Sequence, residues 1–353
     1  MAGERLAVTV AIVAYNEAAD IGACLQSLCA LDYPRELYDI LVVDNGSTDA
    51  TRDITHGFAQ RLPGLRVVVN PQRGVGAQRN TALRQAARDF LAFTDADCTV
   101  PPDWLSQLER AMREARAADP RVAAVGGPNR EPEVCSRFRR AVAIGVKSYW
   151  GNQGSVQGAL LERPASVAHL PTLNVLYDRK LVLAEGGFDE QMGNISEDVE
   201  LSYRLRWRGY TLMFTPAAVV RHKWRGDISS WARNIVVYGK GRIWLMKKDR
   251  RFFHPLRIAP LGLLAATLLF PLTRLPLYLL PALYLVLTAI ASVQACLKER
   301  RPGFIIDVFV FFIVTHYAYG IGEVVGLLQP RGCDVANLPP AKIPGTDVPP
   351  APR

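Results

Sequence analysis

In Leu91–Cys98, LAFTDADC, an apolar run ends abruptly in two carboxylates. Asp95 and Asp97 are separated by one alanine, so on an extended strand both side chains would point the same way. Hard divalent cations such as Mg²⁺ and Mn²⁺ prefer carboxylate oxygens together with substrate phosphates. Because ligands of open α/β sheets collect outside the carboxyl ends of strands, the stretch predicts a metal–diphosphate site. A solvated turn is the alternative, since Asp is common in turns.

Strand-like and helical patterns alternate along the first part of the chain. Short apolar runs typical of strands occupy Leu6–Val13, Tyr38–Val43, Leu65–Val69, Asp89–Thr94 and Ala123–Gly126. Apolar residues at helical spacing occupy Ile21–Leu31, Thr51–Gln60, Gly76–Arg88 and Trp104–Ala117. This alternation with short connections predicts a parallel sheet covered by helices on both faces. Arg137–Arg140 and Tyr149–Gly158 have no clear period, and both an acceptor loop and an interfacial helix stay open for them.

Polar clusters follow directly after three of these strands, at Tyr15–Glu17, Asp44–Gly46 and Asp95–Asp97. The placement predicts that the clusters converge on one edge of the sheet. A carboxylate such as Asp44 at a strand end accepts hydrogen bonds from a ribose or a base. Gly74–Gly76 opens the next helix, whose amino end approaches a diphosphate closely, and Arg79 adds positive charge there. A simple tight turn is the alternative for Asn45–Gly46.

A fourth cluster comprises Gly186–Glu190 and the run Ile195–Arg206, in which Ser196 is predicted to cap a helix. Two interpretations of the acids Glu197 and Asp198 stand side by side. The dipole of a helix stabilises carboxylates in its first turn without any further role. Alternatively, one of them removes the proton of an acceptor hydroxyl opposite a leaving diphosphate. The composition of the segment does not decide between the two.

Two long apolar stretches follow towards the carboxyl end. Ile258–Leu297 carries Arg274 as its only charge and predicts two short helices turned around Leu272–Pro276. Phe304–Leu328 contains three ionisable residues that are costly in lipid unless they face other helices, namely Asp307, His316 and Glu323. Together, residues 258–328 predict about three transmembrane helices. A buried helical hairpin of a soluble protein is the alternative.

Basic residues flank the apolar stretches and predict the topology. They are Lys247, Lys248, Arg250, Arg251 and Arg257 before the first stretch, and Lys298, Arg300 and Arg301 after it. The positive-inside rule places both groups in the cytoplasm. No secretory signal opens the sequence, so the N-terminal part is expected to be cytosolic at the inner cell membrane. The third apolar segment then leads outward and leaves the Pro-rich tail, 329–353, outside.

The net charge of +9 and the pI near 9.4 are accounted for by this membrane-facing basic belt. No helix-turn-helix, zinc-finger or RNA-recognition pattern accompanies the charge, so nucleic acid is not expected as a partner. The six cysteines show no CxxC spacing and are expected to be reduced thiols. Cys98 adjoins the predicted metal site, but proximity alone does not make a thiol a ligand.

Taken together, the motifs resemble the family-2 inverting glycosyltransferases of GT-A fold, most of all membrane-anchored bacterial members similar to the succinoglycan-type glucosyltransferases. The resemblance runs from about Val8 to Gly241 and continues through the apolar segments. It rests, in family order, on AYNE, VVDNGSTD, RGVGAQRN, FTDADC, GGFDE, SEDVELSYRLRWRGY, VVRH and YGKGR. It implies an α/β, nucleotide-sugar-binding, Rossmann-like mixed sheet in residues 1–227, a basic juxtamembrane segment in 228–257, and the transmembrane helices and tail beyond.

The same resemblance implies roles on the donor side of the site. The residues that would hold the base and ribose of the nucleotide sugar are Tyr15, Glu17 and Asp44. Arg79 and Asp95 would contact the nucleotide. Asp97 would carry the Mg²⁺ or Mn²⁺ ion that bridges the diphosphate. His222 is a further candidate metal contact, with a purely structural histidine as the alternative.

On the acceptor side, Asp198 matches the catalytic base of the family, and Glu197 is the alternative base. Gly187 would border the acceptor pocket. Processive members carry a Gln-x-x-Arg-Trp motif that the corresponding region, Trp231–Arg242, lacks. The sequence therefore favours transfer of single sugars, with three basic residues near donor or acceptor phosphates or, equally, lipid headgroups: Arg233, Lys240 and Arg242.

The leading hypothesis is metal-dependent, inverting transfer of a sugar, expected to come from a UDP-sugar, to a lipid-linked acceptor in glycan, exopolysaccharide or glycolipid assembly. A polyprenyl-phosphate glycosyltransferase is the alternative within the class, because a phosphate acceptor needs no strong general base. A non-catalytic membrane scaffold that keeps the nucleotide-sugar fold is the alternative from another class. The paired acids Asp95 and Asp97, together with Glu197 and Asp198, argue against a scaffold.

Overall fold

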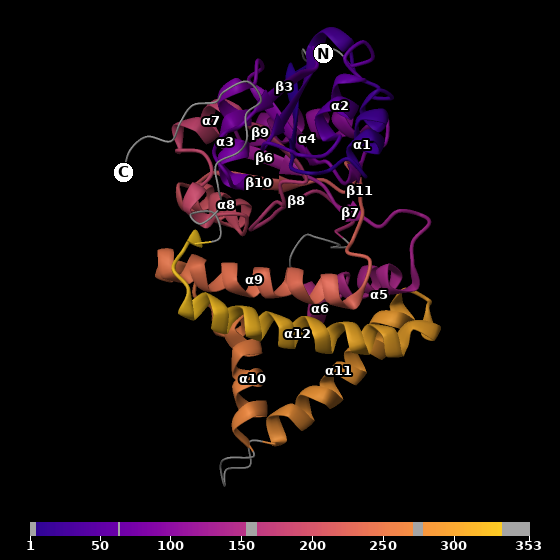
Figure 1. The fold of residues 1–353 in the computed structure, drawn as a ribbon, viewed down its shortest axis with the longest axis vertical. Helices are drawn as coiled ribbons and strands as arrows, with labels where there is room; N and C mark the ends of the chain where they lie inside the picture. Colours follow the sequence, from indigo (N-terminus) through magenta and orange to yellow (C-terminus); the bar gives the residue numbers. More distant parts are fainter. Residues whose placement is uncertain (1–4, 63, 153–160, 271–277, 334–353) are drawn as a thin grey trace.

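The computed structural model describes residues 5–62, 64–152, 161–270 and 278–333, and its centre is an eight-stranded sheet in the order β3-β2-β1-β4-β9-β6-β10-β8 (Figure 1). The strands of this sheet are β1 (Val8–Ala14), β2 (Tyr38–Asp44), β3 (Arg66–Val69), β4 (Phe90–Asp95), β6 (Val122–Gly126), β8 (Ala165–Ser166), β9 (Asn174–Asp178) and β10 (Thr211–Phe214). The strands β3, β2, β1 and β4 run parallel, as does β10 beside β6. Antiparallel β9 joins β4 to β6, so the sheet is mixed, as the fold class requires.

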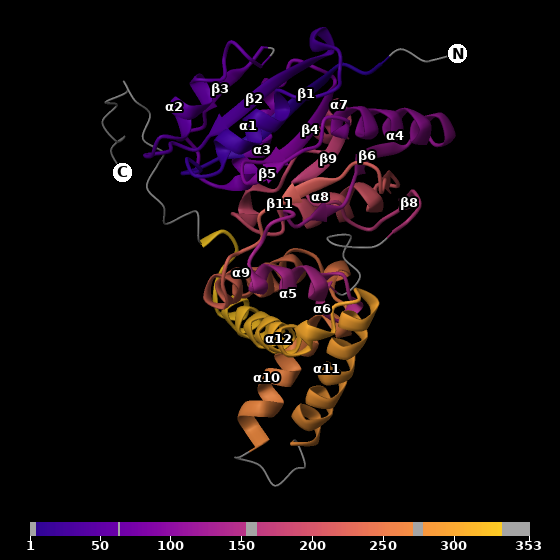
Figure 2. The same cartoon turned by 90° about the vertical axis from the view of Figure 1, so that its right-hand side faces the viewer.

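Helices cover both faces of the sheet, as predicted (Figures 1 and 2). They are α1 (Ile21–Leu28), α2 (Thr51–His56), α3 (Val75–Gln85), α4 (Trp104–Ala118), α7 (Arg179–Ala184) and α8 (Glu197–Trp207). Alternate residues of β1 supply the two faces, because successive side chains of a strand point to opposite sides. Val10 and Ile12 pack with α1 and α4, whereas Ala11 lies in the opposite core with α3 and α8.

A small second sheet lies beside the carboxyl end of β4. Its strands are β5 (Cys98–Thr99), β11 (Val220–His222) and β7 (Asn129–Arg130), in the order β5-β11-β7. His222 is paired in register with Cys98. This pairing brings a residue from late in the chain next to the Asp95–Asp97 motif.

Below the sheet, a separate helical layer carries the apolar segments (Figures 1 and 2). Its helices are α5 (Arg137–Val146), α6 (Tyr149–Asn152), α9 (Ile228–Lys248), α10 (Ala259–Leu269), α11 (Leu279–Lys298) and α12 (Ile305–Leu328). Long α9 and α12 lie side by side, whereas α10 and α11 project away from the sheet domain. For Arg137–Arg140 the sequence left an acceptor loop and an interfacial helix open. The structure shows a helix there, α5, which packs on α12.

Close backbone contact joins α9 to α12. A Cβ atom at Gly239 would lie 2.1 Å from the carbonyl oxygen of Tyr319, and one at Gly322 would lie 2.1 Å from that of Val236. Small residues allow this approach, as in helix pairs within membranes. Lys247 donates to the last carbonyl groups of α12, at 2.8 Å from the oxygen of Gly326. The two helices therefore form one closely packed pair.

The arrangement of α12 corrects the predicted topology. At its carboxyl end, Arg331 donates to Gln191 Oε1 of the sheet domain at 2.8 Å. At its amino end, Asp307 pairs with Arg137 of α5 at 2.6 Å. Since both ends lie against the sheet-domain side, α12 does not lead outward as the sequence predicted. The Pro-rich tail from 334 onward and the turn around 271–277 lie outside the described residues.

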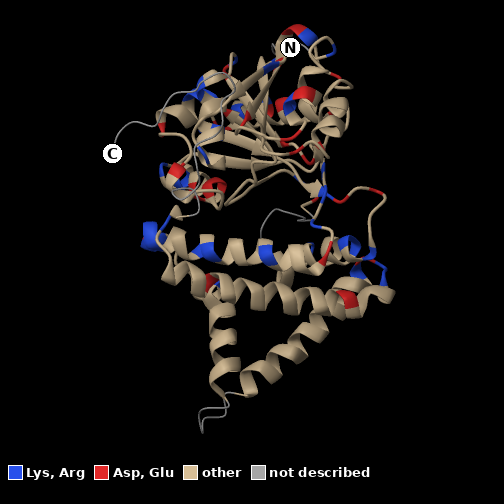
Figure 3. Cartoon of the chain, viewed as in Figure 1, with Lys and Arg blue, Asp and Glu red and all other residues tan. Residues whose placement is uncertain are grey.

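Within the described residues, two helices are long and apolar enough to cross a membrane, Leu279–Lys298 and Pro302–Leu328. The first predicted span, α10, has 11 residues and is only about 16 Å long, which is too short to cross alone. Figure 3 shows lysine and arginine gathered at the level of α9 and α5, while α10 and most of α11 carry no charge. Membrane association is supported, but a multi-pass topology with three spans is not.

Candidate active site

The carboxyl ends of three parallel strands meet in register at one edge of the sheet. Ala14 of β1 pairs with Asp44 of β2, and Val13 of β1 pairs with Asp95 of β4. Tyr15 follows directly on β1, between the two acids. The convergence expected from the sequence is therefore present in the fold, because β2, β1 and β4 are neighbours in the sheet.

Asp44 lies fully buried with one carboxylate oxygen held and the other without a partner. Its Oδ2 accepts hydrogen bonds from the backbone N–H groups of Gly46 and Ser47, at 3.0 and 2.9 Å. Its Oδ1 has no hydrogen-bond partner among the described residues. A buried oxygen without a partner is costly, and here it leaves an acceptor ready for a ribose hydroxyl or a base N–H.

Tyr15 and Glu17 form the outer wall beside Asp44. The ring of Tyr15 is partly exposed, and the guanidinium of Arg73 lies over it at 4.7 Å from the ring centroid. The backbone N–H of Glu17 donates to Thr51 Oγ1 at 2.8 Å, which fixes the loop. Burial, together with the carboxylates of Asp97, Asp20 and Asp95, raises the pKa of Glu17 to about 7. The site thus concentrates negative charge, as a cation-binding site does.

Asp95 and Asp97 are not on one continuous strand. β4 ends at Asp95, and Asp97 lies in the turn before β5. The expectation that both side chains share one face of an extended strand is therefore wrong, because the chain turns between them. Burial and the neighbouring Asp97 carboxylate raise the pKa of Asp95, although Arg79 lies 3.7 Å away and opposes the shift.

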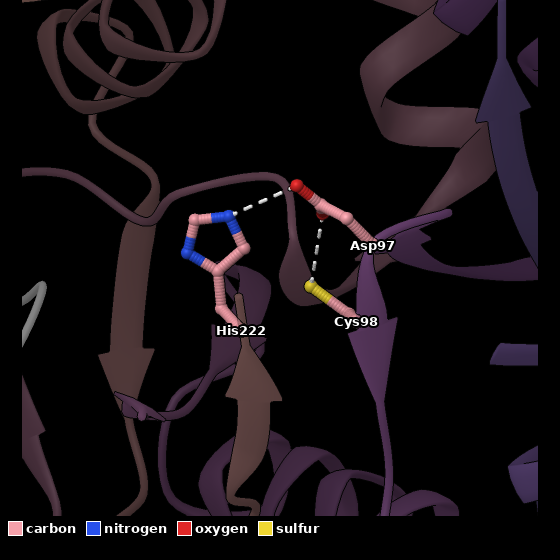
Figure 4. A group of neighbouring side chains, drawn as sticks. All are labelled: Asp97, Cys98 and His222. Atoms are coloured by element: carbon pink, nitrogen blue, oxygen red, sulfur yellow. Dashed lines mark hydrogen bonds and ion pairs between the residues drawn. The ribbon is translucent and has the colours of Figure 1, made fainter. Parts of the chain in front are cut away.

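His222 and Asp97 face each other across the small sheet (Figure 4). Nε2 of His222 lies 3.3 Å from Oδ2 of Asp97, and the Sγ atom of Cys98 lies 3.7 Å from its Oδ1. Burial opposes ionisation of Asp97, but the hydrogen bond and charge of His222 hold its pKa below the ordinary value. Burial and the two aspartates raise the pKa of Cys98 well above its ordinary value, so Cys98 stays a thiol.

The donor set fits a divalent ion. Ligand atoms of Asp97, Cys98 and His222 all lie within 4.8 Å of one another. Sulfur is a soft ligand that suits metals other than Mg²⁺ and Mn²⁺, which leaves one carboxylate and one imidazole from the protein. Mg²⁺ and Mn²⁺ sites commonly use one or two such ligands and complete their shell with substrate phosphates and water. Asp97 and His222 are thus the residues that would hold the ion.

Arg79 of α3 connects Asp95 at the end of β4 with Glu197 at the start of α8. Its buried guanidinium donates to the carboxylate of Glu197 and lies 3.7 Å from Asp95. The sequence predicted a direct contact between Arg79 and the nucleotide, whereas the fold shows its charge shared between two acids. Glu197, buried and ion-paired in this way, is poorly placed to act as a base.

Asp198 has a different environment from its neighbour. Its Oδ2 lies 3.2 Å from Nε2 of His169, and its Oδ1 accepts from the backbone N–H of Val199 at 2.7 Å. Burial opposes ionisation, but the charge and hydrogen bond of His169, with Arg79, hold the pKa of Asp198 below its ordinary value. His169 was not found from the sequence, because a lone histidine in a segment without a pattern gives no signal.

The start of α8 differs from the predicted cap. Ser196 occupies the N-cap position, but it has φ 58° and its side chain makes no cap hydrogen bond. A left-handed backbone is unusual for serine and costs about 1–3 kcal/mol, which is the kind of strain that functional sites store. The conformation turns the chain so that Glu197 and Asp198 enter the site at the first turn of the helix.

Gly187 lies in a loop that is fastened to α3 and α8. A Cβ atom there would lie 2.4 Å from Asn80 Oδ1, and the residue has φ 67°, so glycine is required. Its carbonyl accepts a hydrogen bond from Arg204 of α8. The backbone of Phe188 donates to Asn80 at 2.8 Å. These contacts give Gly187 a packing role, and its place beside an acceptor stays a prediction.

The three basic residues of α9 do not form a cluster. Arg233 is near the start of the helix and donates to Ser229 at 2.6 Å. Lys240 is buried, with its ammonium 5.0 Å from the ring centroid of Trp244. Arg242 donates to the Tyr319 hydroxyl of α12 at 3.2 Å, and its NH1 group has no partner among the described residues. Their phosphate-binding role stays a prediction.

Comparison with known proteins supplies the family. The profile described as "Glycosyl transferase family 2" matches residues 9–182, which hold the ends of β1, β2 and β4. A succinoglycan biosynthesis protein (ExoA) of Rhizobium meliloti is 30% identical over 263 residues, covering 72% of this chain and 76% of the relative. The chain belongs to glycosyl transferase family 2. It is a glycosyltransferase with the nucleotide-sugar-binding fold.

Two further relatives of this glycosyltransferase are informative. A Methanococcus voltae protein is 22% identical over 331 residues, covering 90% of this chain and 98% of its own, and is named dolichyl N-acetyl-alpha-D-glucosaminyl phosphate 3-beta-D-2,3-diacetamido-2,3-dideoxy-beta-D-glucuronosyltransferase. The mannosyltransferase PcManGT of Pyrobaculum calidifontis, solved with GDP-Man and Mn²⁺, has TM-score 0.60 and 22% identity, covering 92% of this chain and 88% of its own. This second likeness supports the fold.

Proposed function

We propose that this glycosyltransferase moves a single sugar from a nucleotide-diphosphate sugar, expected to be a UDP-sugar, to a lipid-linked acceptor with inversion at the anomeric carbon. The observation that carries the proposal is the buried ion network of Arg79, which joins Asp95 on the donor side to Glu197 beside Asp198. One arginine thus fixes the distance between the acids of the metal–diphosphate side and the candidate base. A non-catalytic scaffold would have no use for that arrangement.

The reaction is a single displacement. Asp198 takes the proton of the acceptor hydroxyl, whose oxygen bonds to the anomeric carbon from the face opposite the diphosphate. The bond between that carbon and the diphosphate oxygen breaks, and its electron pair leaves on the diphosphate. A divalent ion held by Asp97 and His222 would supply positive charge to the leaving group. His169 orients Asp198, and Asp44 holds the nucleoside.

The lipid-linked acceptor is supported by the apolar helices below the site. Cys296 and Phe312 belong to the core that joins α11 and α12 to α9, so the apolar segments are part of the same folded unit. Met192, Trp244 and Phe252 form a further core that ties α9 and the segment after it to the loop before α8. We infer that the α10–α11 hairpin enters the inner membrane from the cytoplasmic face, with α9 and α12 lying at the interface.

An assay of sugar transfer tests the proposed function. The full chain, reconstituted in lipid nanodiscs, would be incubated with Mn²⁺ and a panel of radiolabelled nucleotide sugars, with membrane lipid extract as acceptor. The proposal requires one donor whose label moves into the organic phase. Calorimetry with the matching nucleotide diphosphate separates the alternatives. Binding without any transfer from any donor would favour the scaffold, and failure of every nucleotide diphosphate to bind would refute the donor assignment.

Membrane attachment is expected to depend on the exposed apolar face of α11. The side chains of Leu283 and Val286 are 54% and 57% exposed, although both are apolar. Lysine near the centre of a membrane helix costs about 2.5–3.5 kcal/mol, so the double variant Leu283→Lys, Val286→Lys should lose resistance to carbonate extraction. Val134→Lys is the control, because Val134 is 92% exposed but lies in the loop between β7 and α5, outside the apolar helices. Carbonate resistance that survives the double variant would contradict the attachment by α11.

A further inference from the structure

A cavity of about 580 Å³ lies between the projecting helices and the layer above them. Its walls come from α6, α10, α11 and α12 and from the short turn Pro255–Ile258 that precedes α10. Figure 1 shows α10 and α11 projecting from the layer that contains α12. The volume falls within the roughly 300–1,000 Å³ of ligand pockets. None of the residues assigned above to donor, metal or base lines it.

The lower walls are apolar and aromatic. Trp150 stacks on Tyr284 with ring centroids 6.3 Å apart, and Leu263 and Leu280 line the cavity from α10 and α11. His316 has both ring nitrogens engaged, one by the Tyr284 hydroxyl and one by the Trp150 carbonyl, each at 2.9 Å. With its imidazole engaged in this way, the aromatic and aliphatic wall suits a hydrocarbon chain.

The upper rim is basic. His254 and Arg257 line the cavity where the chain passes from the layer of α9 into α10. Arg257 donates to the hydroxyl of Tyr203 on α8, and its guanidinium lies 5.4 Å from the Tyr203 ring centroid. Tyr203 is five residues beyond Asp198 on the same helix, which is roughly 7–8 Å along the axis. A group bound at Arg257 would thus lie next to the helix that starts in the active site.

We propose that this cavity holds the hydrocarbon chain of a lipid phosphate, with the phosphate at Arg257 and His254 and the carried sugar directed towards Asp198. The proposal rests on the proposed function, since it names the class of its acceptor. A rim that carries the Arg257 guanidinium above an apolar cavity is complementary to an anionic head on an apolar chain. Arginine is well suited to phosphate because its planar fork donates two parallel hydrogen bonds. The lipid phosphate would be the anchor, and the hydroxyl of the sugar that it carries would be the nucleophile.

Gly262 offers a test of the cavity. A Cβ atom at Gly262 would meet no other atom within 4 Å, although the residue lines the cavity. Gly262→Trp should therefore fill the space without forcing the backbone. Gly303 is the matched control, because a Cβ there also meets nothing within 4 Å, while the residue does not line the cavity. The probe is radiolabelled farnesyl phosphate, and its binding to the full chain in phosphatidylcholine nanodiscs is measured above partitioning into empty discs.

Saturable binding of farnesyl phosphate is expected for the wild-type protein and for Gly303→Trp. Gly262→Trp should weaken binding by about tenfold or more. Arg257→Gln should weaken farnesyl phosphate by about 10- to 100-fold, the value of a charge-assisted hydrogen bond, and leave farnesol unchanged. Inorganic phosphate should not compete. If Gly262→Trp does not fold, the comparison of farnesyl phosphate with farnesol in Arg257→Gln still tests the proposal.

Three outcomes would overturn the proposal. They are an absence of saturable binding in the wild-type protein, unchanged binding in a folded Gly262→Trp, and equal competition by dioleoyl phosphatidate, which would make the cavity a site for ordinary membrane phospholipid. The assay contains no nucleotide sugar, so its result is separate from glycosyl transfer. Binding with no transfer from any donor would count against the proposed function and leave the lipid site standing.

Discussion

Asp198→Asn should lower the rate of sugar transfer by about 10²- to 10⁴-fold, the usual contribution of a general base. The variant keeps the size of the side chain and an oxygen for the N–H of Val199, which bonds to Asp198 Oδ1 at 2.7 Å in the wild type. It cannot take the acceptor proton. Nucleotide-diphosphate affinity should change little, since Asp44 and Asp97 lie on other elements. Steady-state kinetics and calorimetry on the same preparation measure the two quantities.

Two companion variants sharpen this prediction. Glu197→Gln weakens the ion pair with Arg79, so it should lower stability and disturb Asp95, and its effect on the rate should be milder. If Glu197→Gln were inactive while Asp198→Asn kept full rate, the base would be Glu197. If both stayed active, the hydroxyl acceptor would give way to a phosphate acceptor, which needs no strong base.

The pH profile provides an independent readout for His169. Because His169 and Arg79 hold the pKa of Asp198 below its ordinary value of about 3.9, the carboxylate stays ionised at neutral pH. The acid limb of kcat should therefore lie below that ordinary value. His169→Gln removes a stabilising charge, so the pKa of Asp198 should rise and the acid limb should move to higher pH. An unmoved limb would show that His169 has only a packing role.

The sequence predicted well where the strand ends with Asp44 and Asp95 lie, because local signals determine these strands. Strands β1, β2 and β4 begin and end within two residues of the predicted runs, and each acid or polar cluster comes directly after its strand. Parallel neighbours in a sheet bring such strand ends together whatever the side chains are. Asp44 and Asp95 thus needed no tertiary information beyond the order of the strands.

The acceptor half depended on contacts between distant segments, and much of it was not predicted. β9 enters the sheet antiparallel between β4 and β6, although it comes from a segment with no expected strand. His169 reaches Asp198 only because that part of the chain folds back over α8. The direction of α12 was predicted from the positive-inside rule and the order of the apolar segments. In the structure, Arg331, Lys247 and Arg137 hold both of its ends to the protein.

Asp97→Ala should reduce transfer by on the order of 10³-fold at saturating donor, because the loss of several kcal/mol of charge stabilisation corresponds to that factor. Asp97 lies in the turn between β4 and β5 with a partly exposed side chain, so no core cavity opens. The melting temperature should stay close to that of the wild type. Mn²⁺ affinity, followed by electron paramagnetic resonance, should fall together with the rate, and EDTA should inhibit the wild-type enzyme to the same residual level.

Cys98→Ala is the matched control for the metal assignment. The thiol lies 3.7 Å from the Asp97 carboxylate, but Mg²⁺ and Mn²⁺ prefer oxygen and nitrogen ligands to sulfur, so Cys98 is expected to stay outside the ligand set. Its removal should therefore leave Mn²⁺ affinity unchanged while lowering stability modestly, since Cys98 is fully buried. A loss of metal affinity in Cys98→Ala equal to that in Asp97→Ala would show that the sulfur is a ligand. Full activity of Asp97→Ala, or of the wild type in EDTA, would show that the reaction does not use this metal site.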